Sequence, residues 1–466
     1  MSCGLFIDFG STWTKLRAVD LDTGEVIGTA QGPSTVTSDV NRGLDAALAA
    51  LAAAHPRLPA FTCRLASSSA AGGLRMVTVG LVRELTAEAA RQAALGAGAR
   101  LVGSFAYRLT AADVARILAL APDILLLCGG TDGGNAQVIV HNATVLARHA
   151  PLRCPVVLAG NREAADECAA LLREAGATVI VAGNVMPELG VLDTEPARAA
   201  IREIFLAHIV HAKGIDRAAA RFDAVLMPTP AAVLEGARLL ADGIDGEGGL
   251  GPMVVIDPGG ATTDVHSIGD GASEPGVIRH GLPEPYAKRT VEGDLGMRHN
   301  AAAIAESAGL DALAQDAGLA QGAAQSLLDS LTRDVERLPA TEAEHRFDAA
   351  LARAAIRIAM TRHAGARETV YTAQGPVEVQ RGKDLRHAAL LVGTGGVLVH
   401  ARSREALLAA ALADPAAPQS LRPVAPRMVI DAQYALYAVG LLAQVDPAAA
   451  LRLGRSVLAS NEGVPA

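Results

Sequence analysis

Two segments of this chain share one short pattern, and each directly follows an apolar run. Residues 7–15 read IDFGSTWTK and residues 256–264 read IDPGGATTD. Both predict a strand that ends at an Asp, a tight turn with Gly and small hydroxyl residues, and a second strand. Glycine lets backbone N–H groups approach an anion closely, and hydroxyl groups add donors. Each segment therefore predicts a turn that binds phosphate.

The residues expected to contact phosphate and its metal follow from this pattern. The carboxylates of Asp8 and Asp257 stand at strand ends, where they would hold Mg²⁺ through its waters. Asp264 is a further candidate catalytic carboxylate. The candidate phosphate-binding residues are Gly10, Ser11, Thr12, Thr14 and Lys15 in the first turn and Gly259, Gly260, Ala261, Thr262 and Thr263 in the second.

A third Gly-rich turn follows a late apolar run and reads LVGTGG over residues 391–396. Its residues Gly393, Thr394, Gly395 and Gly396 would let the backbone lie flat against a nucleoside. Only 3% of the residues are aromatic, so this backbone is a better base-binding surface than an aromatic side chain. The chain contains no P-loop, and its first strand–helix unit has no dinucleotide-binding fingerprint.

The three turns, in this order, resemble the phosphate-1, phosphate-2 and adenosine motifs of the acetate and sugar kinase, heat-shock chaperone and actin superfamily. Residues 227–236 and 430–440 resemble its two connecting helices. The resemblance implies an α/β fold of two ribonuclease-H-like, actin-like ATPase halves that bind ATP and Mg²⁺. We place these halves at residues 1–241 and 252–466. The first would carry an α/β insertion at about 74–220, and the second a mostly helical insertion at about 286–386.

Within that superfamily, residues 4–15, 127–135 and 255–264 resemble the accessory L component of adenosylcobalamin-dependent glutamate mutase (methylaspartate mutase). This implies an ATP-hydrolysing chaperone that reactivates or protects the mutase, or a related aminomutase, as its partner. We expect the partner to supply the cobalamin, and we expect no direct cobalamin binding by this chain.

Two other functions stay open. One is a small-molecule kinase of the same fold, for which Asp264 would be the base. The other is an ATP-dependent activase of a radical enzyme, which would hold an iron–sulfur cluster through cysteines from two subunits, with Cys128 and Cys154 as the pair to consider.

The loop CGGTDGGN at residues 128–135 follows a predicted parallel strand. Ligands of open α/β sheets bind at the carboxyl ends of strands, so Gly130, Thr131, Asp132, Gly133, Gly134 and Asn135 would form a polar loop near the cleft. Alternatively, the loop is a tight connection in which Asn135 caps the next helix.

Charge and composition argue against a nucleic-acid-binding protein and against a membrane-spanning protein. The net charge is −8, from 41 basic and 49 acidic residues, which argues against a general nucleic-acid partner. No apolar run approaches the roughly 18 residues of a membrane span, and five scattered cysteines fit a reducing compartment. We therefore expect a cytoplasmic protein without a membrane partner, and homodimerisation stays open. Lysine is rare in this chain, which draws attention to Lys15 in the first turn.

Three local expectations concern the second half. Residues 276–279 are predicted to form the third strand of its sheet, and residues 368–379 to form a β-hairpin. The segment from Lys383 to His387 is predicted to be a solvated turn.

Overall fold

The computed structural model describes residues 2–10, 13–35, 40–68, 75–83, 85–97, 99–149, 153–212 and 223–459. Ser11 and Thr12 of the first turn lie outside the described residues. Two compact units emerge: unit 1 comprises residues 1–233 and 281–285, and unit 2 comprises residues 234–280 and 286–466. The division falls inside helix α8 (Thr229–Asp242) rather than in the Gly-rich segment 242–251, because Gly236 of α8 packs on the backbone of residues 436 and 440 in unit 2.

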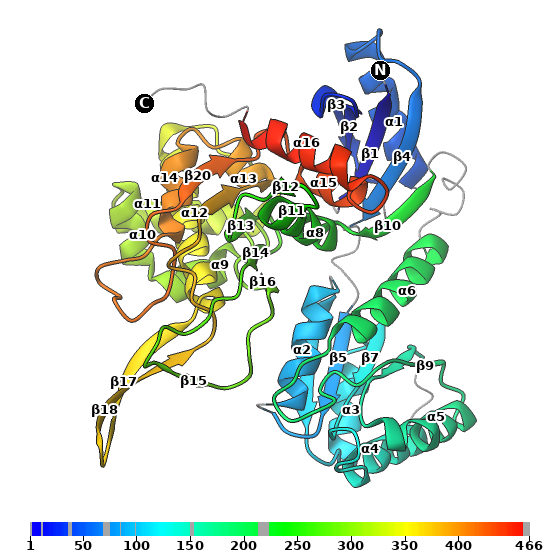
Figure 1. Cartoon of the computed structure of the whole chain (residues 1–466). Coiled ribbons are helices and arrows are strands. Elements are labelled where there is room, and N and C mark those ends of the chain that lie inside the picture. The colour runs from blue at the N-terminus through cyan, green and yellow to red at the C-terminus, as the bar shows by residue number, and fades with distance from the viewer. Residues whose placement is uncertain are drawn as a thin grey trace. The chain divides into compact units, whose positions relative to one another are not determined.

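The central sheet of unit 1 has the strand order β3-β2-β1-β4-β10. Strands β1, β2 and β3 form an antiparallel meander, and β4 and β10 continue the sheet in parallel to β1 (Figure 1). This 3-2-1-4-5 order is the ribonuclease-H-like arrangement that the sequence predicted. The bounds are β1 Cys3–Phe9, β2 Trp13–Asp20, β3 Glu25–Pro33, β4 Phe61–Ser68 and β10 Ala224–Pro228.

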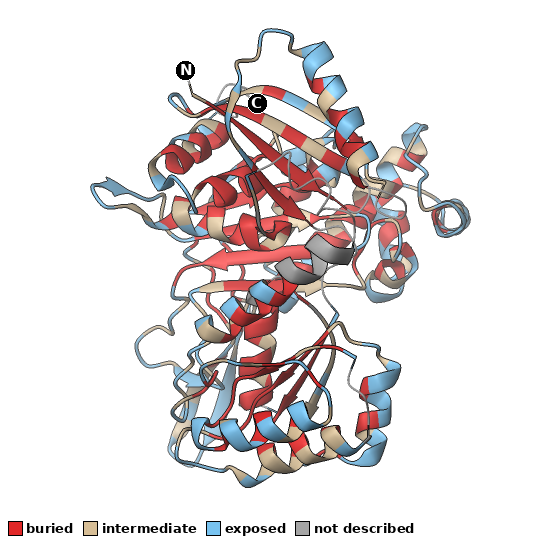
Figure 2. Ribbon diagram, turned by 90° about the vertical axis from the view of Figure 1, so that its right-hand side faces the viewer, coloured by how far each residue is buried: buried red, intermediate tan, exposed pale blue. Residues whose placement is uncertain are grey.

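Helix α1 (Val40–Ala54) covers this sheet by packing on β2 and β3. Its buried residues Val40, Leu44, Ala47 and Leu51 recur at helical spacing and form one apolar stripe. Strand β1 is buried at every residue, and Figure 2 colours such buried residues red. The Asp at the end of β1 is therefore held in a rigid, water-poor setting.

The α/β insertion of unit 1 forms a second sheet in the order β6-β5-β7-β8-β9, with all strands parallel. This is the doubly wound order 2-1-3-4-5. Strand β7 is fully buried, as a central parallel strand covered on both faces should be. The bounds are β5 Arg75–Gly80, β6 Arg100–Ala106, β7 Ile124–Leu127, β8 Val156–Leu158 and β9 Val179–Val181, with helices α2 Thr86–Gly96, α3 Ala111–Ala119, α4 Gln137–His149, α5 Ala165–Glu174 and α6 Glu195–Ala212.

Unit 2 repeats the 3-2-1-4-5 order in the sheet β16-β14-β13-β19-β20. The predicted third strand at 276–279 is wrong: β16 takes that place, while residues 278–280 form β15 in another sheet. The reason is burial, because Lys288–Thr290 of β16 are buried against β14, whereas β15 is exposed along its length. The bounds are β13 Met253–Pro258, β14 Thr263–Ile268, β16 Ala287–Glu292, β19 Leu390–Gly393 and β20 Arg427–Ile430.

The insertion of unit 2 is helical as expected, but it begins after β16 rather than at residue 286. Its longest helix, α12, starts at a capping box in which Thr341 and Glu344 satisfy each other's backbone N–H groups. The predicted hairpin is confirmed as β17 and β18. The bounds are α9 Ala301–Ala308, α10 Leu310–Ala317, α11 Gln321–Arg333, α12 Glu342–His363, β15 Ile278–His280, β17 Ala366–Thr372 and β18 Gly375–Arg381.

Short helices complete unit 2 around its sheet. They are α13 Gly395–Val399, α14 Arg404–Leu408, α15 Leu436–Leu442 and α16 Pro447–Ala459, and a small hairpin joins β11 Gly243–Ile244 to β12 Glu247–Gly248. Within the described part of the chain, no helix is both long enough and apolar enough to cross a membrane.

Candidate functional site

The two repeated sequence segments occupy equivalent places in the two sheets. In unit 1, Asp8 at the end of β1 lies opposite Lys15 of β2. In unit 2, Asp257 near the end of β13 lies opposite Asp264 of β14. Both turns therefore join the first and second strands of a 3-2-1-4-5 sheet, and the sequence repeat reflects a structural repeat.

Asp8 is buried, with 1% of its surface exposed, and it is surrounded by polar partners. Thr229 donates a hydrogen bond to its Oδ1 at 2.6 Å, and Lys15 Nζ lies 3.8 Å from its Oδ2. The hydroxyl oxygens of Thr229 and Ser67 lie 3.1 Å apart. Burial raises the pKa of the Asp8 carboxyl, while Lys15 and the Thr229 hydrogen bond oppose that shift. The site thus concentrates one carboxylate, one ammonium and two hydroxyls at a strand end.

Gly10 allows the first turn to close tightly. Its N–H donates to Trp13 O at 3.1 Å, and a Cβ at this position would lie 2.5 Å from that carbonyl. Thr14 points into the fold, where its hydroxyl lies 3.1 Å from that of Ser34. Thr14 therefore has a structural partner.

The second turn is held by the segment that follows β16. The carbonyls of Gly259 and Gly260 accept hydrogen bonds from the backbone N–H groups of residues 297–299, and Ala261 O accepts from Asn300 Nδ2 at 3.0 Å. Gly260 and Ala261 are exposed, and within the described residues their N–H groups have no protein acceptor. Carbonyls fixed on one side and open N–H groups on the other suit the binding of an anion.

Asp264 already has a counter-ion. Arg289 of β16 donates to its Oδ1 from Nε at 2.9 Å and from Nη2 at 2.6 Å, and Thr262 Oγ1 donates to its Oδ2 at 3.0 Å. The neighbouring Thr263 donates to Leu295 O at 2.7 Å and is buried. Asp264 and Thr263 thus fasten the second turn to the sheet.

The third turn lies directly beside the second. Thr394 N donates to Ile256 O at 3.0 Å, since β13 and β19 are parallel neighbours. Gly395 has a φ of +86°, and a Cβ at this position would overlap Asp257 Oδ1. The fold therefore brings the Asp257 carboxylate together with the backbone of Gly393–Gly396, and only glycine fits at residue 395.

Four residues near these turns were not predicted as site residues. Thr229 and Ser67 contact Asp8 or each other, Arg289 pairs with Asp264, and Asp431 accepts a hydrogen bond from Thr394 Oγ1 at 3.0 Å. Asp431 is fully buried and also accepts from Ala435 N and Leu436 N at the start of α15. Thr229 and Asp431 lie in the segments that resemble connecting helices, which is the one signal that pointed to them.

The chemistry of the carboxylates fits a weakly held Mg²⁺ better than a metal cage. Among the described residues, no group of three or more His, Cys, Asp and Glu side chains is arranged to hold a metal ion. Mg²⁺ keeps several waters and needs only one or two carboxylates in addition to substrate phosphates. Asp8 and Asp257 supply carboxylate oxygens of that kind, one in each unit.

The loop at 128–135 is fastened to the ends of the neighbouring strands. Asp132 Oδ1 accepts from Arg162 N at 3.0 Å and from Asn184 Nδ2 at 2.9 Å. Asn161 Nδ2 donates to Gly134 O at 3.2 Å. Asn135 Oδ1 accepts from Val138 N at 3.1 Å, so Asn135 does cap α4. The polar groups of this loop are therefore largely used in hydrogen bonds that hold the loop in place.

The cysteines do not support an iron–sulfur site. Cys128 follows β7 and Cys154 precedes β8. Because these neighbouring strands are parallel, Cys128 lies at the carboxyl ends of the strands and Cys154 at their amino ends. Both are buried; burial raises the pKa of Cys154 to about 11 and that of Cys128 further. Because both thiols are buried, neither is placed to contribute to a cluster shared between two subunits.

A duplicated ribonuclease-H-like sheet with matched phosphate-type turns defines the actin-like ATPase class of fold. A family model described as MutL protein matches residues 4–458, and the chain belongs to that family. Protein MutL of Clostridium tetanomorphum is 45% identical over 471 residues, which cover 98% of this chain and 99% of that relative.

Solved structures resemble the chain only distantly. A gluconate kinase from Lactobacillus acidophilus has 12% identity and a TM-score of 0.33, covering 99% of this chain and 90% of its own. A glycerol dehydratase reactivase has 11% identity and a TM-score of 0.34, covering 95% of this chain and 99% of its own. The strand orders of the two central sheets define the fold.

Proposed function

We propose that this protein binds and hydrolyses Mg-ATP in order to reactivate or protect an adenosylcobalamin-dependent mutase. The observation that carries the proposal is the duplicated turn: each sheet presents a carboxylate at the end of its first strand, followed by a turn rich in glycine and hydroxyl groups. Each of these turns is of a kind that suits the binding of a phosphate group.

The residues have distinct proposed roles. Asp8 and Asp257 hold Mg²⁺ through its waters, and the bound ion would offset phosphate charge. Lys15 and the first turn bind phosphate, and so do the open N–H groups of residues 260 and 261. Asp264 positions the second turn through Thr262 and Arg289. The turn at Gly393–Gly396 supports the nucleoside.

The proposed partner is glutamate mutase or a related aminomutase, in the cytoplasm. Family membership and the 45% identical relative support an accessory role. The partner supplies the cobalamin. Residues 264–269 of this chain read DVHSIG and match the D-x-H-x-x-G pattern of cobalamin domains, but His266 is buried within strand β14 and Asp264 is paired with Arg289.

The test is ATPase activity with and without cobalamin-inactivated glutamate mutase, scored also for recovered mutase activity. We expect hydrolysis that needs Mg²⁺ and recovery that needs ATP. Asp8→Asn and Asp257→Asn should each abolish both, whereas Asp245→Asn, in the exposed 243–248 hairpin, should leave both unchanged.

The same preparation is then offered a panel of acids and sugars with ATP. A phosphorylated product formed without any mutase would overturn the accessory role in favour of a kinase. Normal hydrolysis by both carboxylate variants would overturn the site itself.

A further inference from the structure

A β-sheet arm extends from unit 2 and exposes both of its faces. It consists of β17, β18 and the short β15, in the order β15-β18-β17 (Figure 1). Six of the seven residues of β17 are exposed, and Tyr371 has 83% of its surface accessible. An exposed edge strand presents unpaired N–H and C=O groups that can pair with another chain.

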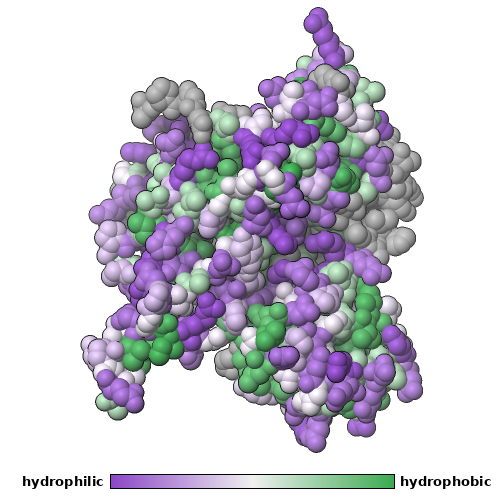
Figure 3. Space-filling view, in the orientation of Figure 1, coloured by the Kyte–Doolittle hydropathy of each residue, from purple (hydrophilic) through white to green (hydrophobic). Residues whose placement is uncertain are grey.

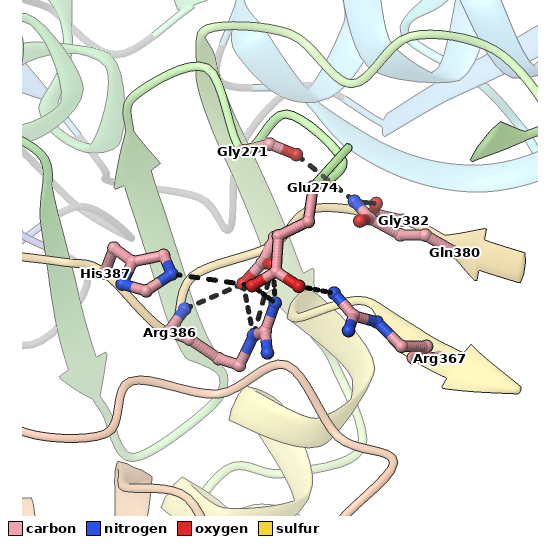
Figure 4. Close-up of polar contacts among 8 residues, drawn as sticks. Gly271, Glu274, Arg367, Gln380, Gly382, Arg386 and His387 are labelled. Atoms are coloured by element: carbon pink, nitrogen blue, oxygen red, sulfur yellow. Dashed lines mark hydrogen bonds and ion pairs between the residues drawn. The ribbon is translucent and has the colours of Figure 1, made fainter. Parts of the chain in front are cut away.

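Hydrogen bonds fix the base of the arm to unit 2. At its base, Glu274 accepts hydrogen bonds from Arg367 Nη2 at 2.8 Å and from Arg386 Nη2 at 2.7 Å (Figure 4). Gln380, which is fully buried, donates to Gly271 O at 3.2 Å and Gly382 O at 3.0 Å. The arm therefore presents its outer edge in a fixed direction.

The outer edge of β17, on the side away from β18, has unpaired backbone groups at Thr369 and Tyr371. The direction of these groups follows from their neighbours: Thr372 pairs with Gly375 at the hairpin turn, and Arg367 N donates away from β18 to Gln419 O at 2.8 Å. Because successive residues of a strand alternate, Thr369 and Tyr371 also direct their N–H and C=O groups away from β18. Within the described chain these four groups have no protein partner.

We propose that the arm joins two copies of this chain by antiparallel pairing of β17 with β17 about a two-fold axis at Val370. In this register Thr369 lies opposite Tyr371 of the second copy, and Tyr371 opposite its Thr369. Each such pair exchanges two hydrogen bonds, so all open groups are satisfied. The pairing is limited at one end of β17 by Arg367, whose N–H already donates to Gln419 O, and at the other end by the hairpin turn after Thr372.

The side chains suit the same register. Val370 lies opposite itself in a non-hydrogen-bonded pair, where side chains approach most closely. It shares a face of the arm with Val377, Val379 and Ile278, so two copies would form one continuous apolar face. Figure 3 shows hydrophobic side chains beside hydrophilic ones where the arm lies, at lower left. Glu368 lies opposite Thr372 of the second copy, so no like charges meet.

Cysteine cross-linking tests the register, with Cys63→Ser as the background because the other cysteines are buried. Under mild oxidation with diamide, Val370→Cys should give a disulfide-linked dimer, since opposite residues have Cα atoms about 4.5–5.5 Å apart. Thr369→Cys and Tyr371→Cys should each form no disulfide-linked dimer alone, yet an equimolar mixture of the two should cross-link. Cross-linking of Thr369→Cys alone to the same extent as Val370→Cys would refute the register.

Sedimentation measures the association itself. A short strand pair buries less than the roughly 1,200 Å² of a standard interface, so we expect a dimer that dissociates on dilution. Tyr371→Pro removes one outward N–H without touching the bonds to β18, and it should weaken dimerisation at least tenfold, whereas Tyr371→Phe should not. A chain that stays monomeric at every concentration, or an edge that only the mutase protects from hydrogen exchange, would overturn the proposal.

Discussion

Replacing Thr229 by Val tests how the buried carboxylate of the first turn is stabilised. The two side chains have nearly the same shape, so the change removes the hydroxyl and little else. It deletes the 2.6 Å hydrogen bond to Asp8 and the contact with the Ser67 hydroxyl. A hydrogen bond to a charged group contributes about 1.5–3 kcal/mol and a neutral one about 1 kcal/mol. We therefore expect the free energy of unfolding to fall by about 3 kcal/mol at pH 7.

The charge on Asp8 should account for most of this loss. In an Asp8→Asn background no buried charge remains, so Thr229→Val should cost only about 1 kcal/mol, which leaves a coupling of about 2 kcal/mol. Asp8→Asn alone should stabilise unit 1 at neutral pH. Burial raises the pKa of the Asp8 carboxyl in the folded protein. The stability that the protonated carboxyl contributes is therefore fully present below the ordinary pKa of 3.8 and is lost as pH rises through the higher folded value.

Urea unfolding followed by the emission of Trp13 measures these effects. Trp13 is the only tryptophan, and it stands in β2 next to the first turn. A Thr229→Val variant within 0.5 kcal/mol of the parent, about the scatter of neutral surface substitutions, would refute the reasoning. So would an equal cost of Thr229→Val in the two backgrounds.

Three further predictions concern unit 2. Gly395→Ala should abolish ATP binding in a calorimetric titration, because its Cβ would overlap the carboxylate at the end of β13, while Gly248→Ala, with nothing within 4 Å, should bind normally. Gly296→Ala should weaken ATP binding at least tenfold by displacing the second turn, whereas Gly322→Ala, with nothing within 4 Å, should leave it unchanged; equal affinities would contradict this. The hydrogen bond from Arg337 lowers the pKa of Glu344 from 4.5 to about 2, so the stabilisation of α12 should persist above pH 4.5 and disappear as pH falls through about 2. Circular dichroism of Glu344→Gln should lack that acid loss.

The lysines illustrate where interpretation of the sequence was incomplete. Scarcity pointed to Lys15, which does pair with Asp8. The segment at 383–387 was predicted to be a solvated turn, yet Lys383 is fully buried and donates to Tyr286 O at 2.7 Å and Ser267 O at 3.3 Å. Lys288 is buried as well and donates to His363 O at 2.9 Å. Both lysines satisfy backbone carbonyls of distant segments, which no local pattern reveals.

The sequence alone determined the elements whose causes are local. An apolar run, an Asp and a Gly-rich turn are sufficient to specify each hairpin, and alternating strands and helices specify the α/β insertion. The matched places of Asp8 and Asp257 follow from that repeated pattern.

Tertiary structure decided everything that depends on distant partners. Residues 276–279 look like a strand, but β16 is the third strand because its residues bury against β14. Asp8 depends on Thr229, and Asp264 on Arg289, which lie far away along the chain. Burial turns such contacts into strong constraints, since a desolvated polar group must find its partner inside the fold.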